Sequence, residues 1–329
     1  MKINKYITII SLVASLSYTA FAGNDTGTTT AAFLKIIPGA RPAGMGNAFT
    51  AISDDCNAIY TNASGISQVK SLQVSASHII WFEDITNTSI ALVQPMGLNA
   101  VGVGINYLSM GAIEARDNFG NIQAENSTVN SNVISLAYSR KISSQFSVGI
   151  TAKNVTQKLG IYSGYCATTD ISSLYKTKAG EGDFSAGIAL QNLGSQMTIA
   201  DVSNPIPAIT RVGFCYAPVN ILKIAIDIDK SNDSDMKIAA GVEYIYQRAF
   251  AFRAGATQID KLTQMKGVTL GIGTRSTLEK KALWEEGVME ESKEEGSEFD
   301  FDYALTLLNE DLGYTHRITL TYKLGNKLR

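Results

Sequence analysis

Histidine and cysteine are scarce in this chain, with two and three copies among its 329 residues. Imidazole and thiolate groups supply most general bases and zinc ligands, so this scarcity argues against most enzyme classes and against a zinc site. Cys56, Cys166 and Cys215 form no CxxC pair, and three cysteines cannot all pair within one chain. The motifs GxSxG, HExxH and GxxxxGKS/T are also lacking. We therefore expect no catalytic residue, no metal and no cofactor.

A surplus of basic charge is missing as well. Lys and Arg total 28 against 30 Asp and Glu, a formal charge of −2, so no excess exists to neutralise nucleic-acid phosphates. After residue 22, no apolar run approaches the roughly 20 residues that a membrane helix needs. A nucleic-acid partner and a helical membrane protein are thus excluded. A hydrophobic content of 45% also excludes an intrinsically disordered chain.

Residues 1–22 have the organisation of a secretory signal peptide. Lys2 and Lys5 precede the apolar stretch from Tyr6 to Tyr18, and Ala20-Phe21-Ala22 supplies a small-x-small cleavage site. We expect cleavage after Ala22, which sends the chain out of the cytoplasm. The alternative is a buried helix at the N-terminus.

The body of the chain alternates between apolar and polar residues with a period of two, as β-strands do. From residue 222 to 229, for example, every second residue is leucine or isoleucine, and Lys223, Asp227 and Asp229 lie between them. Clusters of Gly, Asn, Asp, Ser and Pro separate fourteen such segments. The predicted strands are 71–80, 86–95, 99–113, 128–140, 144–158, 167–177, 183–193, 207–217, 219–229, 236–247, 249–257, 266–276, 298–307 and 315–324.

The number of these segments and their connections predict a transmembrane antiparallel β-barrel. Bacterial outer-membrane barrels have an even number of strands, short periplasmic turns and longer outer loops. Here the links after even strands are mostly short, whereas those after odd strands are longer, notably 114–127, 159–166 and 194–206. Aromatic residues near strand ends, among them Trp81 and Phe82, fit interfacial girdles. A soluble β-sandwich with one wet face also alternates, but it does not account for the asymmetry of the links.

Residues 38–65 are rich in Gly and Ala and lack the period of two, so they cannot form a lipid-facing strand. Small residues permit close approach of the backbone to a surrounding wall, and Ser53 or Asp54 could cap a short helix that ends at Tyr60. We therefore expect a signal peptide (1–22), an N-terminal segment with a lumenal hatch (23–66) and the barrel (67–329). An external linker is the alternative to the hatch. The candidate hatch residues are Arg41, Gly44, Gly46, Asp54, Asp55, Asn62 and Gly65.

Charged residues of both signs fall on the inner face of the predicted wall. We expect them to form salt-bridge networks that hold the wall and the hatch together, with Arg41 joining in and Asp54 or Asp55 pairing with wall arginines. A selectivity ring is the alternative. Four glycines inside alternating strands also face inward and would make room for the hatch: Gly102, Gly104, Gly271 and Gly273. The candidate lumen-facing charges are Lys153, Arg211, Asp227, Glu243, Arg253, Arg275 and Arg317.

One stretch of the chain carries a family resemblance. Residues 39–55 read Gly-Ala-Arg-Pro-x-Gly-Met-Gly-x-Ala-Phe-x-Ala-Ile-x-Asp-Asp, and Asn-Ala-Ile-Tyr follows at 57–60. This resembles the N-terminal signature of the PorV/PorQ family, which is related to FadL-type outer-membrane barrels, and residues 170–175, 191–194 and 311–320 resemble its later motifs. The resemblance implies a fourteen-stranded barrel plugged by an N-terminal hatch. Residues 62–65 depart from the family, with Asn-Ala-Ser-Gly in place of Asn-Pro-Ala-Gly.

The resemblance leaves two functions open. Similarity to FadL-type proteins implies passive passage of hydrophobic small molecules across the bacterial outer membrane, with a capture site in an apolar outer loop that contains Met197, Ile199, Val202 and Ile206. Similarity to PorV implies a component of type IX secretion that binds exported proteins and delivers them to surface-attachment machinery. The expected partners are outer-membrane lipids together with either a hydrophobic ligand or secreted proteins and secretion machinery.

Residues 279–297 form an acidic insertion, with seven glutamates against three lysines. A charge run of this kind is typical of a solvated loop. The alternative is a docking segment, in which Leu283, Trp284 and Val288 form the apolar edge of a short helix.

Overall fold

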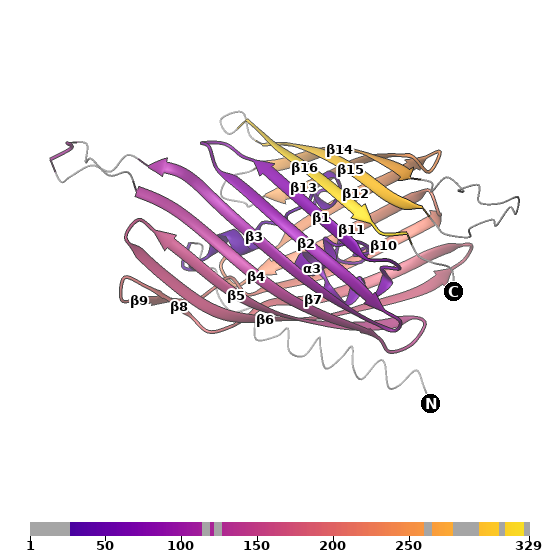
Figure 1. The fold of residues 1–329 in the computed structure, drawn as a ribbon, viewed down its shortest axis with the longest axis horizontal. Helices are drawn as coiled ribbons and strands as arrows, with labels where there is room; N and C mark the ends of the chain where they lie inside the picture. Colours follow the sequence, from indigo (N-terminus) through magenta and orange to yellow (C-terminus); the bar gives the residue numbers. More distant parts are fainter. Residues whose placement is uncertain are drawn as a thin grey trace, which may run out of the picture.

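The computed structural model describes residues 27–113, 119–121, 127–259, 265–278, 296–308 and 313–325. Fourteen antiparallel strands form a closed barrel, in which β1 pairs with β16 and thereby joins the two ends of the sheet (Figure 1). The wall strands are β1 (Gln73–Ile80), β2 (Thr86–Met96), β3 (Asn99–Ile113), β4 (Ser127–Lys141), β5 (Phe146–Leu159), β6 (Tyr162–Ala179), β7 (Gly182–Gly194), β10 (Ile209–Val219), β11 (Leu222–Ser231), β12 (Lys237–Tyr246), β13 (Phe250–Ile259), β14 (Met265–Leu278), β15 (Ser297–Leu307) and β16 (Tyr314–Lys323).

The predicted fourteen-stranded barrel is confirmed, with one error in its connections. Leu159 of β5 pairs directly with Tyr162 of β6, so the long link predicted at 159–166 is a tight turn. Gly160 takes the positive φ of 60° that this turn requires. The link predicted at 194–206 contains a two-stranded sheet of its own, formed by β8 (Met197–Ile199) and β9 (Val202–Asn204).

The barrel has two different ends. At the short-turn end, tight turns join β2 to β3, β4 to β5, β10 to β11 and β12 to β13. At the long-link end lie the links that follow β1, β3 and β7. The predicted acidic insertion joins β14 to β15 at the short-turn end, but residues 279–295 lie outside the described residues.

The two faces of the wall differ in chemistry, as the alternation predicts. The outer face carries exposed apolar side chains on strand after strand, for example Ile90 on β2, Leu136 on β4, Ile226 on β11 and Leu270 on β14. The inner face carries buried serine, threonine, glycine and charged residues. No helix among the described residues is long and apolar enough to cross a membrane.

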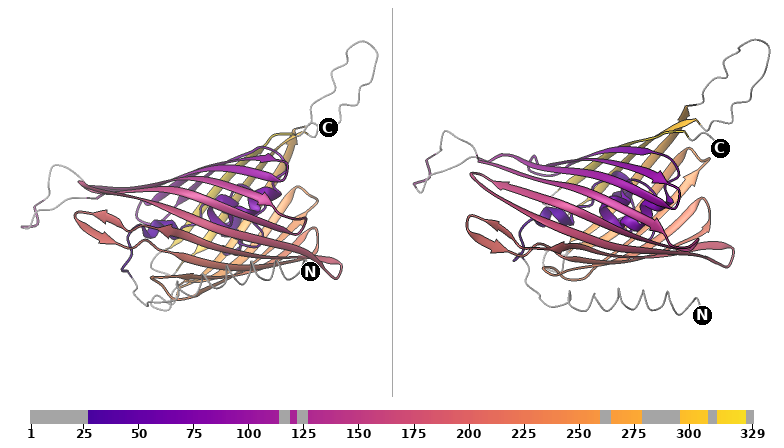
Figure 2. Two further views of the ribbon diagram at one scale, coloured as in Figure 1. Left: turned by 90° about the horizontal axis from the view of Figure 1, so that it is seen from below. Right: turned by 60° about the horizontal axis from the view of Figure 1, so that its bottom comes forward.

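Residues 31–69 lie inside the barrel, where the indigo helices of Figure 2 are enclosed by the strands. This internal segment includes η2 (Ala32–Lys35), α2 (Ala40–Gly44), α3 (Ala58–Thr61) and η3 (Ala63–Gln68). The predicted helix cap is wrong, because α3 begins after Asn57. Ser53 instead donates its hydroxyl to the carbonyl of Phe49 at 2.9 Å, and Asp54 is held in ion pairs.

Inward-facing glycines let the internal segment touch the wall. A β-carbon at Gly241 would lie 2.3 Å from the carbonyl oxygen of Met45, and one at Gly102 would lie 2.9 Å from the Cδ1 atom of Ile59. Side chains cannot approach so closely, so glycine is needed where another backbone comes this near. A β-carbon at Gly149, Gly187 or Gly255 would likewise lie 2.2–2.4 Å from backbone atoms of the internal segment, and one at Gly104 or Gly271 would lie 3.0 Å from Tyr60 or Gly44.

Candidate functional site

A cluster of buried charges joins the internal segment to the wall near the short-turn end. We call it the Arg41 cluster, and it consists of Arg41, Asp54, Asp55, Lys223, Glu243, Arg253 and Asp302. The first three residues belong to the internal segment, and the other four lie on β11, β12, β13 and β15. Residues from five separate parts of the chain therefore meet at one place in the lumen.

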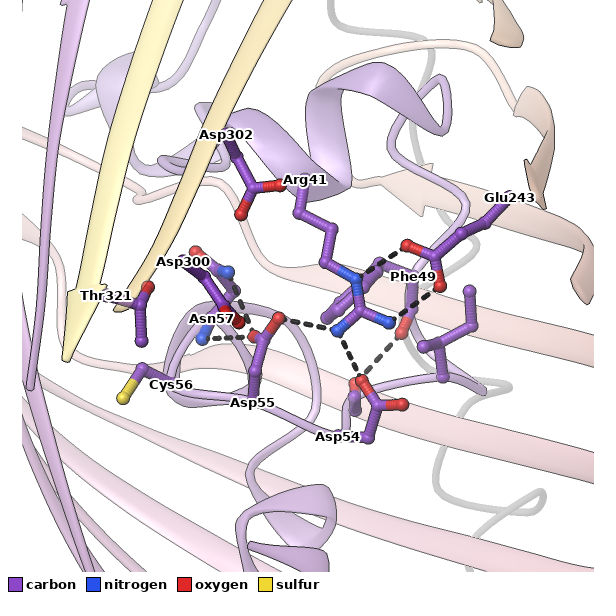
Figure 3. A network of polar contacts seen from close by, with 12 residues as sticks. Arg41, Phe49, Asp54, Asp55, Cys56, Asn57, Glu243, Asp300, Asp302 and Thr321 are labelled. Carbon is purple, nitrogen blue, oxygen red and sulfur yellow. Dashed lines mark hydrogen bonds and ion pairs between the residues drawn. The ribbon is translucent and has the colours of Figure 1, made fainter. Parts of the chain in front are cut away.

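Arg41 lies at the centre of this cluster (Figure 3). Its guanidinium donates two hydrogen bonds to Glu243, at 2.8 and 2.9 Å, and further bonds to Asp54 and Asp55 at 2.6 and 2.7 Å. It also lies over the ring of Phe49, with 5.2 Å from Cζ to the ring centroid. The planar guanidinium matches the two oxygens of Glu243, a geometry that lysine cannot reproduce. Arg41 thus binds a wall carboxylate and two carboxylates of its own segment at once.

Glu243 is shared between the segment and the wall. It also accepts a hydrogen bond of 2.7 Å from Nε of Arg253, and Arg253 in turn donates to Asp302 at 2.7 Å. The Glu243 side chain is only 2% exposed, so removal of its charge would leave two buried guanidinium groups without a main partner.

Asp54 pairs with a wall lysine, whereas the sequence predicted a wall arginine. Its carboxylate lies 2.7 Å from Nζ of Lys223 and 2.6 Å from Arg41. Burial by itself raises the pKa of Asp54, but the positive charges of Arg41 and Lys223 outweigh this and hold the pKa well below its usual value. Asp55 pairs with Arg41 and caps the turn that follows by accepting the backbone N–H of Asn57 at 2.8 Å.

Hydrogen bonds continue this attachment around the wall. Asp227 of β11 accepts the backbone N–H groups of Phe49 and Thr50, at 3.0 and 2.8 Å. Farther around the wall, Ser139 of β4 and Ser147 of β5 both donate to the carbonyl of Ser64. The internal segment is therefore bonded to strands on several sides of the lumen.

The remaining hatch candidates shape the internal segment itself. Asn62 donates to the carbonyl of Thr50 at 2.8 Å and to that of Ser173 at 3.1 Å. Gly46 has a φ of 65° and lies against β13, while a β-carbon at Gly65 would lie 2.0 Å from the carbonyl of Ser53. Gly44 packs on Gly271 of β14. These residues set the close fit between segment and wall, and they carry no reactive group.

Of the remaining lumen-facing candidates, three have carboxylate partners. Lys153 lies 2.6 Å from Asp170, and Arg211 lies 2.5 Å from Asp229. Arg275 is 44% exposed and lies 3.2 Å from Asp300 at the short-turn end. Arg317 differs from them, because within the described part of the chain it donates one hydrogen bond, to the backbone carbonyl of Ile37 at 2.8 Å.

A second feature, which was not predicted from the sequence, lies near the long-link end. It is a cavity of about 420 Å³ between the internal segment and the wall, which we call the outer cavity. Trp81 and Phe82, predicted as girdle residues, line it instead, because they lie in the link after β1. Its other apolar lining includes Phe33, Ile36, Leu108 and Met110, and Arg317 is part of its wall. The sequence showed an aromatic pair at the end of a strand. Such a pair is expected both for a membrane-interface girdle and for a cavity lining, so the sequence did not distinguish the two.

The predicted apolar loop lies at the same end and is partly folded inward. Met197 and Ile206 are 0% and 5% exposed, in a buried cluster with Phe33 and Leu108. Ile199 packs against this cluster, whereas Val202 is exposed. The loop therefore packs against this buried cluster, and of its four apolar candidates only Val202 is exposed.

Among the described residues, no group of acidic, cysteine or histidine side chains is arranged to hold a metal. Cys56, Cys166 and Cys215 are buried and free. His78 and His316 lie on the adjacent strands β1 and β16, where His78 hydrogen-bonds Thr88 and His316 hydrogen-bonds Tyr303. Within the described ranges, neither histidine hydrogen-bonds a carboxylate of the kind that orients the histidine of a Ser-His-Asp triad.

The fold is similar to that of several solved channels. The toluene transporter TodX of Pseudomonas putida matches with a TM-score of 0.58 and 10% identity, over 88% of this chain and 99% of that one. The monoaromatic hydrocarbon channel CymD matches with a TM-score of 0.57 and 12% identity, over 89% and 98%. A FadL homologue of Pseudomonas aeruginosa matches with a TM-score of 0.51 and 10% identity, over 94% and 100%. At these identities the likeness concerns the fold alone.

Comparison of the sequence with proteins of curated function finds no match. Comparison with family models does find one. The model described as "Uncharacterised protein family (UPF0164)" matches residues 7–275, which include the internal segment and the wall from β1 to most of β14. Because this match covers well over half of the sequence, the chain belongs to the UPF0164 family.

Proposed function

We propose that this protein is a bacterial outer-membrane channel that binds hydrophobic small molecules in the outer cavity and lets them pass through the barrel. The observation that carries the proposal is the outer cavity itself. It is a mostly apolar, open space of ligand size at one end of the lumen, bordered by the wall and by residues 32–37. Ligand sites are typically concave and mostly apolar with a few polar groups.

The outer surface supports a location in the membrane. Apolar side chains cover the outward positions of the wall, and a closed barrel leaves no unpaired backbone groups to face lipid. The similar solved structures include proteins named as transporters of toluene and channels for monoaromatic hydrocarbons. The short-turn end then faces the periplasm, in keeping with a cleaved signal peptide at 1–22.

The internal segment acts as the hatch in this proposal, which keeps the predicted division into an N-terminal segment with the hatch (23–66) and a barrel (67–329), except that residues 67–69 also lie inside the lumen. It closes the lumen below the outer cavity, so passage requires it to shift. The Arg41 cluster holds the segment at the short-turn end through ion pairs. Because these pairs require short distances and a specific geometry, they are either formed or broken. Passage therefore requires the bonds between Arg41 and Glu243 to open.

The test is a cavity-filling substitution with a matched control. Ile85 lines the outer cavity just before β2, whereas Ile90 on β2 faces outward. In a bacterial host that expresses the protein, entry of the hydrophobic fluorophore N-phenylnaphthylamine into intact cells reports passage. We expect Ile85→Trp to reduce entry to the level of cells without the protein, and Ile90→Trp to leave it unchanged. Equal entry with wild type and Ile85→Trp, at equal barrel levels, would contradict the proposal.

A role in type IX secretion rests only on the motif resemblance to the PorV/PorQ family. It predicts that secreted proteins or secretion components copurify with the barrel. No contact, cavity or comparison described above favours it, so passage of small molecules is the function that we propose.

A further inference from the structure

We propose that the two histidines of the chain form a site on the lipid-facing surface that binds the phosphate group of a membrane lipid. The site lies where β16 meets β1, and we call it the histidine seam. It consists of His78, His316 and the two residues that hydrogen-bond them, Thr88 and Tyr303. The inference rests on the membrane location in the proposed function but not on passage, because neither histidine lines the outer cavity.

Closure of the barrel places the two histidines side by side. β16 pairs with β1 so that His78 lies opposite Ile318 and His316 lies opposite Ile80 (Figure 1). Residues on one face of paired strands that are offset by two positions are diagonal neighbours, about 7–8 Å apart and within reach of ring side chains. The two imidazoles therefore border the same patch of the surface, although they are far apart in the sequence.

Both histidines face outward, where apolar residues predominate. Along both strands, the residues directly before and after the histidine are buried in the lumen. The next outward residues of β16 are Ile318 and Leu320, and both are exposed. Polar side chains on a lipid-facing surface are unfavourable and are typically kept for a function. A pair of them at one place therefore indicates a binding site.

The histidine seam lies at the outer border of the apolar surface. β1 ends at Ile80, just after His78, and β16 begins at Tyr314, just before His316. Beside the seam, Tyr107 of β3 is exposed and pairs with Thr88. Exposed tyrosines near strand ends are typical of the aromatic girdle at the level of lipid head groups. The two histidines are thus placed to meet phosphate groups rather than the ends of acyl chains.

The hydrogen bonds of the two rings determine which nitrogen remains for a ligand. Nδ1 of His78 lies 2.9 Å from the hydroxyl of Thr88 on β2, and Nδ1 of His316 lies 2.8 Å from the hydroxyl of Tyr303 on β15. A hydroxyl that donates to Nδ1 fixes the tautomer with its proton on Nε2. Within the described ranges, each ring makes this one hydrogen bond, so Nε2–H of each is left to donate to a ligand.

The positions of the hydroxyl partners also direct the two Nε2 atoms. β2 lies on one side of the pair of strands β1 and β16, and β15 lies on the other side. The two nitrogens of an imidazole ring point in divergent directions, so each Nε2–H is turned away from its hydroxyl partner and toward the seam. The two donors therefore converge on the space between the rings.

Two convergent N–H donors fit an anion with several acceptor oxygens, such as a phosphate group. Hydrogen bonds to a charged acceptor are shorter and stronger than neutral ones. Among the described residues of β15, β16, β1 and β2, no carboxylate occupies an outward position where it would compete for these donors. Exposed isoleucines border the seam and would contact acyl chains, namely Ile80, Ile90 and Ile318. These apolar contacts favour the phosphate of a lipid over free phosphate.

The experiment uses the presence of only two histidines in the chain. The full-length protein, purified through a tag without histidine and labelled with ¹⁵N-histidine, gives NMR signals from His78 and His316 alone. Micelles of a maltoside detergent contain no phosphate. Three additions are compared: phosphatidylglycerol, a galactosyl diacylglycerol with the same acyl chains, and inorganic phosphate. Native mass spectrometry of the same samples measures the affinity for each lipid.

We expect phosphatidylglycerol to shift the Nε2 signals of both histidines and to bind about tenfold more tightly than the galactolipid. Inorganic phosphate at the same concentration should shift neither signal. His78→Phe and His316→Phe each remove one donor and should weaken phosphatidylglycerol binding about threefold to tenfold. The double variant should bind both lipids equally. Tyr244→Phe, which removes an outward-facing hydroxyl on β12, is the control, and heat-modifiable mobility on gels checks that each variant folds.

Three outcomes overturn the inference. Equal affinities for the two lipids, or a double variant that keeps the preference, would show that the histidines do not recognise phosphate. Equal shifts with inorganic phosphate and with the lipid would show an anion site that is not a lipid site. Shifts that depend on barrel concentration, together with the mass of a dimer, would show a contact between two barrels.

These outcomes are distinct from failure of the proposed function. Passage is tested separately by Ile85→Trp, and neither result decides the other. Only failure of the barrel to insert into lipid bilayers would contradict both.

Discussion

The two ends of the lumen are built on opposite principles. At the short-turn end, the Arg41 cluster brings three cations and four carboxylates of the internal segment and wall into direct contact. At the long-link end, the same segment leaves an apolar cavity of about 420 Å³, lined by the guanidinium of Arg317, which no carboxylate of the described residues pairs with. At the short-turn end, each charged group of the cluster contacts a group of opposite charge. The cavity at the long-link end is apolar, and its guanidinium has no such contact among the described residues.

The difference shows that the internal segment is attached to the wall at one end of the lumen and leaves space for a ligand at the other. Buried ion pairs have strict geometry, and loss of one partner is costly, so the Arg41 cluster is suited to hold the segment in one position. An apolar cavity has little directional preference, so it is suited to accept molecules of varied shape. Four substitutions test this contrast, beginning with the largest expected effect.

The removal of Glu243 should have the largest effect on stability. Glu243→Leu leaves Arg41 and Arg253 buried without their shared partner, and we expect the free energy of unfolding to fall by about 3–5 kcal/mol. Denaturant titration of the barrel in detergent, followed by heat-modifiable mobility, measures this. A loss below about 1 kcal/mol would show that the cluster does not hold the segment.

An added side chain at Gly241 should separate the segment from the wall. A β-carbon there would lie 2.3 Å from the carbonyl oxygen of Met45, so Gly241→Val should cost about 1–3 kcal/mol and raise the passage of small polar solutes in liposome-swelling assays. Ala240→Val, on the outward face of the same strand, is the control. Equal swelling rates for the two variants would argue against a close fit at Gly241.

Acid should weaken the polar junction through Asp54. The pKa of Asp54 is lowered in the folded protein, so its contribution is complete above the unfolded pKa of about 4 and is lost as the pH falls through the folded value. Asp54→Asn removes this contribution at neutral pH, so its unfolding free energy should fall less steeply than that of wild type below about pH 4. The measurement is the unfolding free energy of wild type and Asp54→Asn from pH 2 to 7. If both proteins lose stability equally steeply below about pH 4, the ion pairs of Asp54 do not contribute as expected.

At the long-link end, protonation of Asp233 in acid should also lower the stability of the protein, but by less than protonation of Asp54. Asp233 accepts hydrogen bonds from Thr29 and from Lys35, the latter at 2.6 Å. Burial raises its pKa, but these bonds and that of Ser231 lower it overall. Asp233→Asn should cost about 0.5–1.5 kcal/mol and should speed ligand exchange in the outer cavity, because Lys35 lines it. Stopped-flow Trp81 fluorescence measures exchange, and the exposed Asp183→Asn is the control.

Much of the fold could be predicted from local pattern. The period of two identified all fourteen wall strands, because inner and outer faces of a barrel meet different solvents and each residue's face follows from its parity. The error at residues 159–166 arose because Gly160, Ser163 and Gly164 resemble a loop, although two of them continue a strand. Strand pairing, not composition, decides where such a link ends.

The candidate site was predictable only in part. Arg41, Asp54, Asp55, Glu243 and Arg253 were all identified as charged residues inside the barrel. Their pairing was not, and Lys223 took the place expected for an arginine. Lys223 and Asp54 are 169 residues apart, and no local pattern specifies which charge meets which across a lumen.

The sequence by itself determined the number of strands, the faces of each strand and the presence of a segment too rich in small residues to belong to the wall. These properties depend on neighbouring residues, which share one solvent and one backbone period. The tertiary structure alone decided which charges are paired, which glycines are contacts and where the outer cavity lies. Those properties arise when the barrel closes around the segment, because only closure brings distant residues within a few ångströms, where electrostatic and packing forces act.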